Sequence, residues 1–139
     1  MGVGNSLKSD DGIGPYVIEN LKCLENDDLV LVNASTVPEN FTGLIKEENP
    51  SHIIIIDATL MDKKPGTTCV FKKEDLKNVG MSTHAMSLSS LIRYLENFND
   101  FKILFIGIEP ENLDFSFDLS SDIKNSSDKL IELIKRFFI

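Results

Sequence analysis

The run from Ile53 to Ile56 constrains the fold more than any other part of the sequence. Four consecutive isoleucines leave no polar face, so a strand built from them must be buried on both sides. Such strands lie at the centre of parallel sheets. Asp57 follows at the carboxyl end, which is the end where open α/β sheets place their sites. Residues 52–59 are therefore predicted as a central strand that carries a functional carboxylate.

Helix and strand signals alternate along the rest of the chain. Four segments are predicted helices: 12–24, 39–48, 82–98 and 130–138. Three more are predicted strands: 29–32, 67–71 (an edge strand) and 102–108. Residues 111–124 are expected to form an ordered loop. This order predicts a single α/β domain over residues 1–139, a three-layer sandwich with a mostly parallel central sheet flanked by helices.

The N-terminal stretch has the composition of a turn between a strand and a helix. Gly2 and Gly4 come where a strand should end, and Asp10 and Asp11 precede the first predicted helix. One aspartate is expected to cap that helix, and the other to point into the crevice beyond the strand. Only Met1 precedes Gly2, so either the first strand is a stub or the chain has lost its opening residues. We expect the second.

The overall composition excludes several classes of function. The net charge is −8 and no basic cluster is present, which argues against a nucleic-acid partner. No apolar run reaches the roughly 20 residues of a membrane helix, and the start has no signal segment. A cytoplasmic protein is expected. Cys23 and Cys69 form no CxxC motif and are predicted to be buried free thiols.

Asp11, Asp57 and His84 are predicted to form a site together. Each alone has an ordinary structural explanation, but all three fall at strand ends or helix starts on one edge of the sheet. Two carboxylates and one imidazole suit a divalent metal with open coordination positions. His52, which precedes its strand, is expected to be exposed. The serines lack a Gly-x-Ser-x-Gly motif, which argues against a serine hydrolase.

Three motifs in this order carry a family resemblance. They are Gly2-Val3-Gly4-Asn5 with Asp10-Asp11-Gly12-x-Gly14, then Ile56-Asp57-Ala58-Thr59, then Ser82-Thr83-His84-x-Met86-x-Leu88. The sequence resembles the hydrogenase maturation endopeptidases, which trim the C-terminal extension from the large subunit of [NiFe] hydrogenases after nickel insertion. The resemblance covers nearly the whole chain. Val37-Pro38-Glu39-Asn40 and Gly107-Ile108-Glu109-Pro110 make it most similar to the subgroup serving membrane-bound, hydrogen-evolving hydrogenases.

The resemblance implies roles for particular residues. Asp11, Asp57 and His84 would bind the metal and serve catalysis, the metal being nickel already seated in the precursor. Gly4, Asn5 and Asn33 would contact the substrate. The family usually has an aspartate and two glycines after its second strand, whereas this chain has Asn33-Ala34-Ser35, so the contact with the client is expected to differ. The family also has a full first strand before the position of Gly2.

Three functions remain open at this point. The first is a monomeric, nickel-dependent endopeptidase acting on a hydrogenase large-subunit precursor. The second is a non-catalytic nickel-sensing binding partner or chaperone of that precursor, which the Asn33 change and the missing full first strand favour. The third is a metallohydrolase acting on small molecules. The intact set of Asp11, Asp57 and His84 favours the first.

Overall fold

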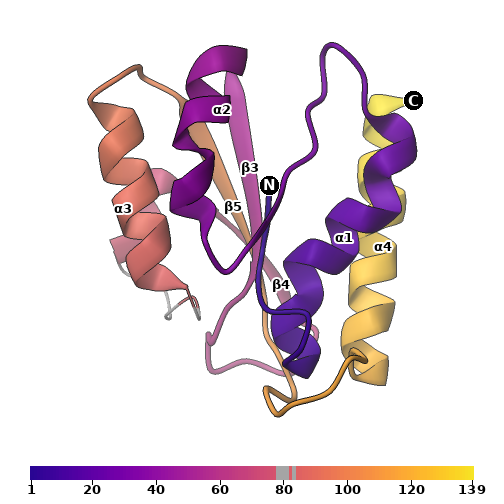
Figure 1. Cartoon of the computed structure of the whole chain (residues 1–139). Helices are drawn as coiled ribbons and strands as arrows, with labels where there is room; N and C mark the ends of the chain where they lie inside the picture. The colour runs from indigo at the N-terminus through magenta and orange to yellow at the C-terminus, as the bar shows by residue number, and fades with distance from the viewer. Residues whose placement is uncertain (78–81, 83) are drawn as a thin grey trace.

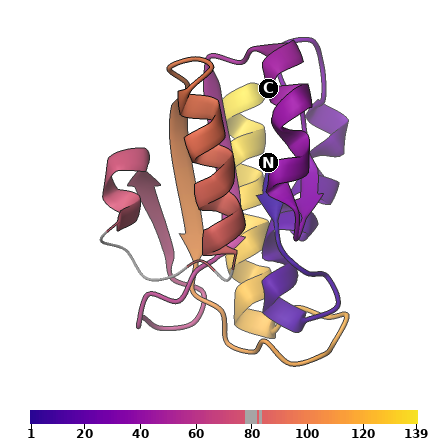
Figure 2. The ribbon, with the colours of Figure 1, turned by 60° about the vertical axis from the view of Figure 1, so that its left-hand side comes forward.

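The computed structural model describes residues 1–77, 82 and 84–139, and its centre is a five-stranded sheet in the order β2-β1-β3-β5-β4. Four strands are parallel: β1 (Gly2–Val3), β2 (Asn33–Ser35), β3 (His52–Ala58) and β5 (Lys102–Ile108). β4 (Thr68–Lys72) pairs antiparallel with β5 and lies at the edge of the sheet (Figure 2). The mostly parallel sheet is confirmed.

Helices cover both faces of the sheet (Figure 1). α1 (Ile13–Leu21) and α4 (Ser121–Phe138) lie on one face, and α2 (Thr42–Glu48) and α3 (Ala85–Glu96) lie on the other. Short 3₁₀ helices complete the connections: η1 (Ser9–Gly12), η2 (Lys22–Leu24), η3 (Pro38–Phe41) and η4 (Lys73–Lys77). The expected three-layer α/β sandwich is confirmed.

The isoleucines of β3 serve both layers, as their sequence predicts. Ile53 and Ile55 pack in the cluster that contains Leu91 of α3, whereas Ile56 packs in the cluster that contains Ile13 of α1 and residues of α4. β3 and β5 stay in register over seven residue pairs, from His52↔Lys102 to Ala58↔Ile108. This register holds Asp57 rigidly at the carboxyl end of the central strand.

α1 lies directly against the backbone of the sheet at Gly14. A Cβ atom at this position would lie 2.2 Å from the carbonyl oxygen of Val3 and 2.6 Å from that of Ile56. Only glycine allows so close an approach. The contact fixes the start of α1, and with it the turn that carries Asp11, over the ends of β1 and β3.

The first strand is present, with two residues. Gly2 pairs with Asn33 of β2 on one side and with Ile56 of β3 on the other. The N–H of Ile56 donates to the carbonyl oxygen of Met1 at 2.9 Å. A short β1 therefore links β2 to the central strands.

The prediction of a strand over residues 29–32 is wrong, because the strand begins at Asn33. Asn26 and Leu29 exchange two backbone hydrogen bonds of 3.2 Å, which close a tight turn. β1 starts only at Gly2, whose N–H bonds to Val32. Residues 29–31 therefore precede the point at which β1 can pair with them, and they form no strand despite their apolar side chains.

Two further expectations need correction. α4 begins at Ser121, so the predicted loop over 111–124 ends four residues early and the helix is much longer than the predicted 130–138. Its first turns bury only Ile123 and Ser127, so the apolar positions there do not show a helical period.

The two cysteines were expected to be buried. Both are free, but Cys23 is exposed because η2 turns it away from the apolar face of α1, and Cys69 is half-buried on the edge strand.

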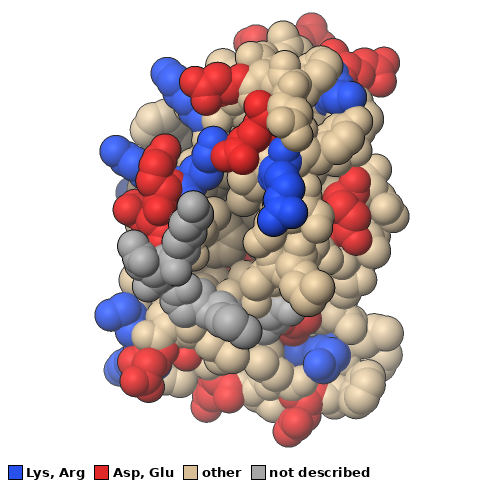
Figure 3. All heavy atoms as spheres, turned by 90° about the vertical axis from the view of Figure 1, so that its left-hand side faces the viewer, with Lys and Arg blue, Asp and Glu red and all other residues tan. Residues whose placement is uncertain are grey.

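Two observations concern the expectations about a basic cluster and a membrane helix. On the face covered by α3, Lys and Arg side chains lie interspersed with Asp and Glu (Figure 3). None of the helices in the described part of the chain is long and apolar enough to cross a membrane.

Candidate metal and catalytic site

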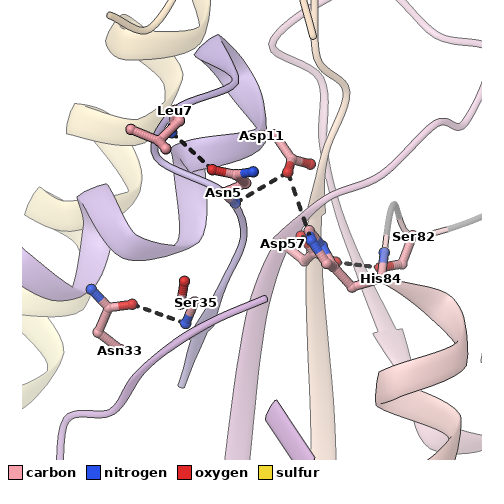
Figure 4. A network of polar contacts seen from close by, with 8 residues as sticks. All are labelled: Asn5, Leu7, Asp11, Asn33, Ser35, Asp57, Ser82 and His84. Atoms are coloured by element: carbon pink, nitrogen blue, oxygen red, sulfur yellow. Dashed lines mark hydrogen bonds and ion pairs between the residues drawn. The ribbon is translucent and has the colours of Figure 1, made fainter. Parts of the chain in front are cut away.

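Asp11, Asp57 and His84 converge at the carboxyl edge of the sheet (Figure 4). Asp11 comes from η1, Asp57 from the end of β3, and His84 from the N-cap position of α3. One ligand atom of each lies within 4.8 Å of the others. His84 Nε2 is 3.7 Å from Asp11 Oδ2, and His84 Nδ1 is 3.4 Å from Asp57 Oδ1. The structure thus brings together the three residues that the sequence predicts.

Gly4 and Asn5 hold Asp11 in place. Gly4 has a φ of +147°, and a Cβ atom there would lie 1.9 Å from the carbonyl oxygen of Asp11. The N–H of Asn5 donates to Asp11 Oδ2 at 3.1 Å, while its side chain accepts a hydrogen bond from the N–H of Leu7. The positive φ and the close approach both require glycine. The predicted contacts of these two residues with substrate stay predictions, but their structural role is clear.

Ser82 ties Asp57 to the start of α3. Its hydroxyl donates to Asp57 Oδ2 and accepts from the N–H of His84 at 3.0 Å. A β-bridge between Thr59 and Ser82 fixes the backbone of this serine beside the end of β3. Ser82 is not among the predicted site residues, although a serine two residues before a helix-start histidine is a sequence signal for a hydroxyl that bonds the backbone two residues on.

The electrostatics of the cluster favour a cation. Asp57 is fully buried, and this burial raises the pKa of its carboxyl against the opposing hydrogen bonds of His84 and Ser82. The hydrogen bond with Asp57 raises the pKa of His84, while partial burial opposes it. Both shifts mean that the cluster holds protons more tightly than free side chains do. Because two buried carboxylates repel each other, a proton or a metal ion stabilises them.

The donor set and its spacing fit a first-row metal ion. Ligands at the 2.0–2.2 Å typical of zinc can be at most about 4.4 Å apart around one ion. The three ligand atoms lie within 4.8 Å, so a small closure of the side chains suffices. Asp11, Asp57 and His84 would hold the ion and leave coordination positions for another molecule.

Asp10 has a different role from the one expected. Neither η1 nor α1 has a side-chain cap, so the prediction that one aspartate caps the following helix is wrong. The fully buried Asp10 instead accepts hydrogen bonds from the N–H groups of Glu111, Asn112 and Ser120 and from the Ser120 hydroxyl, at 2.7–2.9 Å. It therefore stabilises the loop that precedes α4.

Asn33 lies apart from the cluster. It is exposed at the start of β2, and its side-chain oxygen accepts the N–H of Ser35 at 3.1 Å (Figure 4). The structure gives it a turn-forming role, and its contact with substrate stays a prediction. His52 is exposed at the opposite end of β3 from Asp57, as expected.

The sequence profile of a family described as hydrogenase maturation protease matches residues 15–136. The chain belongs to this family. It is 30% identical to the hydrogenase 3 maturation protease of Escherichia coli K12 over 134 residues, covering 96% of this chain and 85% of that one. A putative hydrogenase maturation protease of Methanocaldococcus jannaschii is 39% identical over 142 residues, covering 96% and 83%.

Solved structures agree with this assignment. The hydrogenase-maturating endopeptidase HybD of E. coli superposes with a TM-score of 0.83 at 25% identity, covering 96% of this chain and 86% of HybD. The [NiFe] hydrogenase maturation protease HybD of Thermococcus kodakarensis gives 0.82 at 26% identity, covering 99% and 96%. The family resemblance found in the sequence is confirmed, and this hydrogenase maturation protease is an endopeptidase and hence a hydrolase.

Proposed function

We propose that this hydrogenase maturation protease is a nickel-dependent endopeptidase that removes the C-terminal extension of a [NiFe] hydrogenase large-subunit precursor. One observation carries the proposal. Asp11, Asp57 and His84 present two carboxylates and an imidazole within 4.8 Å of one another, at the sheet edge where α/β domains place their sites. Membership of the maturation protease family supports the class of client.

Nickel enters this proposal as part of the substrate. Three protein ligands leave the site open, and we expect this site to bind a free nickel ion weakly. Nickel already held by the precursor completes its coordination with Asp11, Asp57 and His84, so that only a loaded client is positioned for cleavage. The bound metal supplies Lewis-acid polarisation of the scissile carbonyl or of a water molecule.

The protein's own groups divide the remaining work. Burial and the hydroxyl of Ser82 hold Asp57 in one orientation, with Oδ1 directed at His84 Nδ1. Asp11 lies on the other side of the imidazole: the N–H of Asn5 donates to its Oδ2, which also lies 3.7 Å from His84 Nε2. Asp11 or Asp57 accepts the proton from an attacking water.

The test is cleavage of matched precursors. Nickel-loaded and nickel-free large-subunit precursors from the source organism are incubated with the protein, and their masses are measured. We expect loss of a C-terminal peptide from the loaded precursor alone, and unchanged activity after the protease has been treated with a chelator that is then removed. Cleavage of nickel-free precursor, or tight binding of nickel by the isolated protein, would contradict nickel sensing.

The same experiment separates the non-catalytic alternative. A nickel-sensing chaperone would bind the loaded precursor and leave its mass unchanged. An endopeptidase shortens it, and His84→Ala abolishes the cleavage while the domain stays folded.

A further inference from the structure

The loop between β5 and α4 exposes aromatic side chains in an acidic setting. Phe115 and Phe117 are 84% and 85% exposed, and the acidic side chains of Glu111, Asp114 and Asp118 are also exposed. We call residues 111–118 the acidic–aromatic loop; it lies below α4 in Figure 1. It contains no Lys or Arg. The two phenylalanines are two residues apart in the chain, and adjoining exposed apolar groups mark interaction sites.

The exposure does not come from a loosely held segment. Asp10 accepts four hydrogen bonds from the loop and its junction with α4. Ser9 donates from its N–H to Ser116 and from its hydroxyl to the carbonyl of Asp118, at 2.8 and 3.0 Å. Ser9 has a φ of 48°, which non-glycine residues rarely adopt. The backbone is therefore fixed in a form that keeps both aromatic rings in water.

The acidic–aromatic loop adjoins the candidate site through a short chain of hydrogen bonds. The N–H of Asn5 bonds to Asp11, and the N–H of Leu7 bonds to the Asn5 side chain. The carbonyl of Leu7 in turn accepts the N–H of Ser116 at 3.1 Å. Leu7 is itself 51% exposed, so it adds an exposed apolar side chain beside the loop.

We propose that the acidic–aromatic loop, together with Leu7, is the docking surface for the precursor, and that it binds a segment rich in apolar and basic residues. The inference deepens the proposed function and rests on it. Exposed phenylalanines bind apolar side chains of a partner. Three carboxylates attract a basic segment and repel an anionic lipid surface. A rigid surface also costs less ordering entropy on binding than a flexible one does.

Binding is measured separately from cleavage. Precursor binding and steady-state cleavage are compared for the wild type and the double variant Phe115→Ser/Phe117→Ser. Phe137→Ser is the matched control, because Phe137 is also 85% exposed but lies at the far end of α4 (Figure 1). We expect the double variant to raise Kd and KM about tenfold or more with kcat nearly unchanged, since the surface contributes binding in both ground and transition states. The control should match the wild type.

A second pair of variants tests the charge. Asp114→Lys should raise KM, and the wild-type KM should rise with salt. Glu47→Lys is the control and makes the same change in net charge. Glu47 lies at the C-terminal end of α2, just before the start of β3, whereas Asp57 lies at the other end of that strand. This variant should leave KM unchanged. Melting temperatures of all four variants should stay close to that of the wild type, since the side chains are exposed.

The outcomes separate this inference from the proposed function. A wild type that binds the loaded precursor but does not cut it contradicts the endopeptidase, while a raised Kd in the double variant still supports the docking surface. Unchanged Kd and KM in the double variant overturn the docking surface even if cleavage proceeds. If the wild type is a dimer in solution and the double variant is a monomer, the surface binds a second copy of the chain and the docking proposal is overturned. A wild type that binds no precursor overturns it as well.

Discussion

Ser82 donates a hydrogen bond from its hydroxyl to the buried carboxylate of Asp57. The same oxygen accepts the N–H of His84, so one hydroxyl connects the end of β3 to the start of α3. With Oδ2 engaged by Ser82, Oδ1 of Asp57 is left facing the imidazole. Ser82 is therefore a positioning residue for the carboxylate that we propose to bind the metal.

Replacing Ser82 with alanine should lower kcat by about tenfold or more, because groups that orient metal ligands typically contribute that much. Ser82→Thr keeps the hydroxyl and should restore most of the activity. Calorimetric titration with Cd²⁺ should show the same order of affinity, wild type and Ser82→Thr above Ser82→Ala. If the threonine variant is as impaired as the alanine variant, the hydroxyl is not what positions Asp57.

The neighbouring aspartates should respond differently to the same change. Asp10→Asn replaces an acceptor oxygen with an N–H₂ group facing donors, and should lower the free energy of unfolding by about 3 kcal/mol. Asp11→Asn should abolish cleavage with little change in stability. Urea unfolding and cleavage rates measured on both variants check this, and equal loss of stability in the two would contradict the division of roles.

The stability of the metal-free protein should depend on pH through His84. The hydrogen bond with Asp57 raises the pKa of His84 above its ordinary value of about 6.5, so the folded state binds the proton more tightly than the unfolded state does. This contribution is fully present below the ordinary value and is lost as pH rises through the folded pKa. Urea unfolding from pH 5.5 to 8.5 should therefore show the wild type losing stability relative to His84→Gln. A difference that grows with pH would contradict the assigned direction.

The backbone at Gly4 gives a test of how closely the Asp11 turn must fit. Gly4→Ala would place a methyl group 1.9 Å from the Asp11 carbonyl at a positive φ, so the turn must shift and cleavage should fall sharply. Gly43→Ala is the control, because a Cβ atom at this position in α2 meets nothing within 4 Å. It should raise the free energy of unfolding by about 0.5–1 kcal/mol and leave cleavage unchanged.

The sequence is most informative where one physical requirement dominates. The isoleucine run needs burial on both faces, which predicts β3 to within one residue and puts Asp57 at a strand end. Asp11 and His84 follow because strand ends and helix starts of a parallel sheet share one edge. These predictions use only local pattern and the geometry common to α/β folds.

The sequence is less informative where long-range pairing decides. The apolar run over residues 29–32 has strand character, but the position of β1 determines where β2 begins. Asp10 has the composition of a local cap, yet its partners lie about a hundred residues further along the chain. The role of Ser82 depends on the carboxylate of Asp57, which no local pattern relates to it.

The opposite duties of Asp10 and Asp11 limit how this protein can change over evolutionary time. Deleting one residue between Gly4 and Asp10 would shift the register of the turn by one position. Asp11 would then face the donors of the loop before α4, and Gly12, which has no side chain, would take its place at the site. Substitutions can accumulate along this segment, but its length is fixed by two adjacent residues whose carboxylates serve different parts of the molecule.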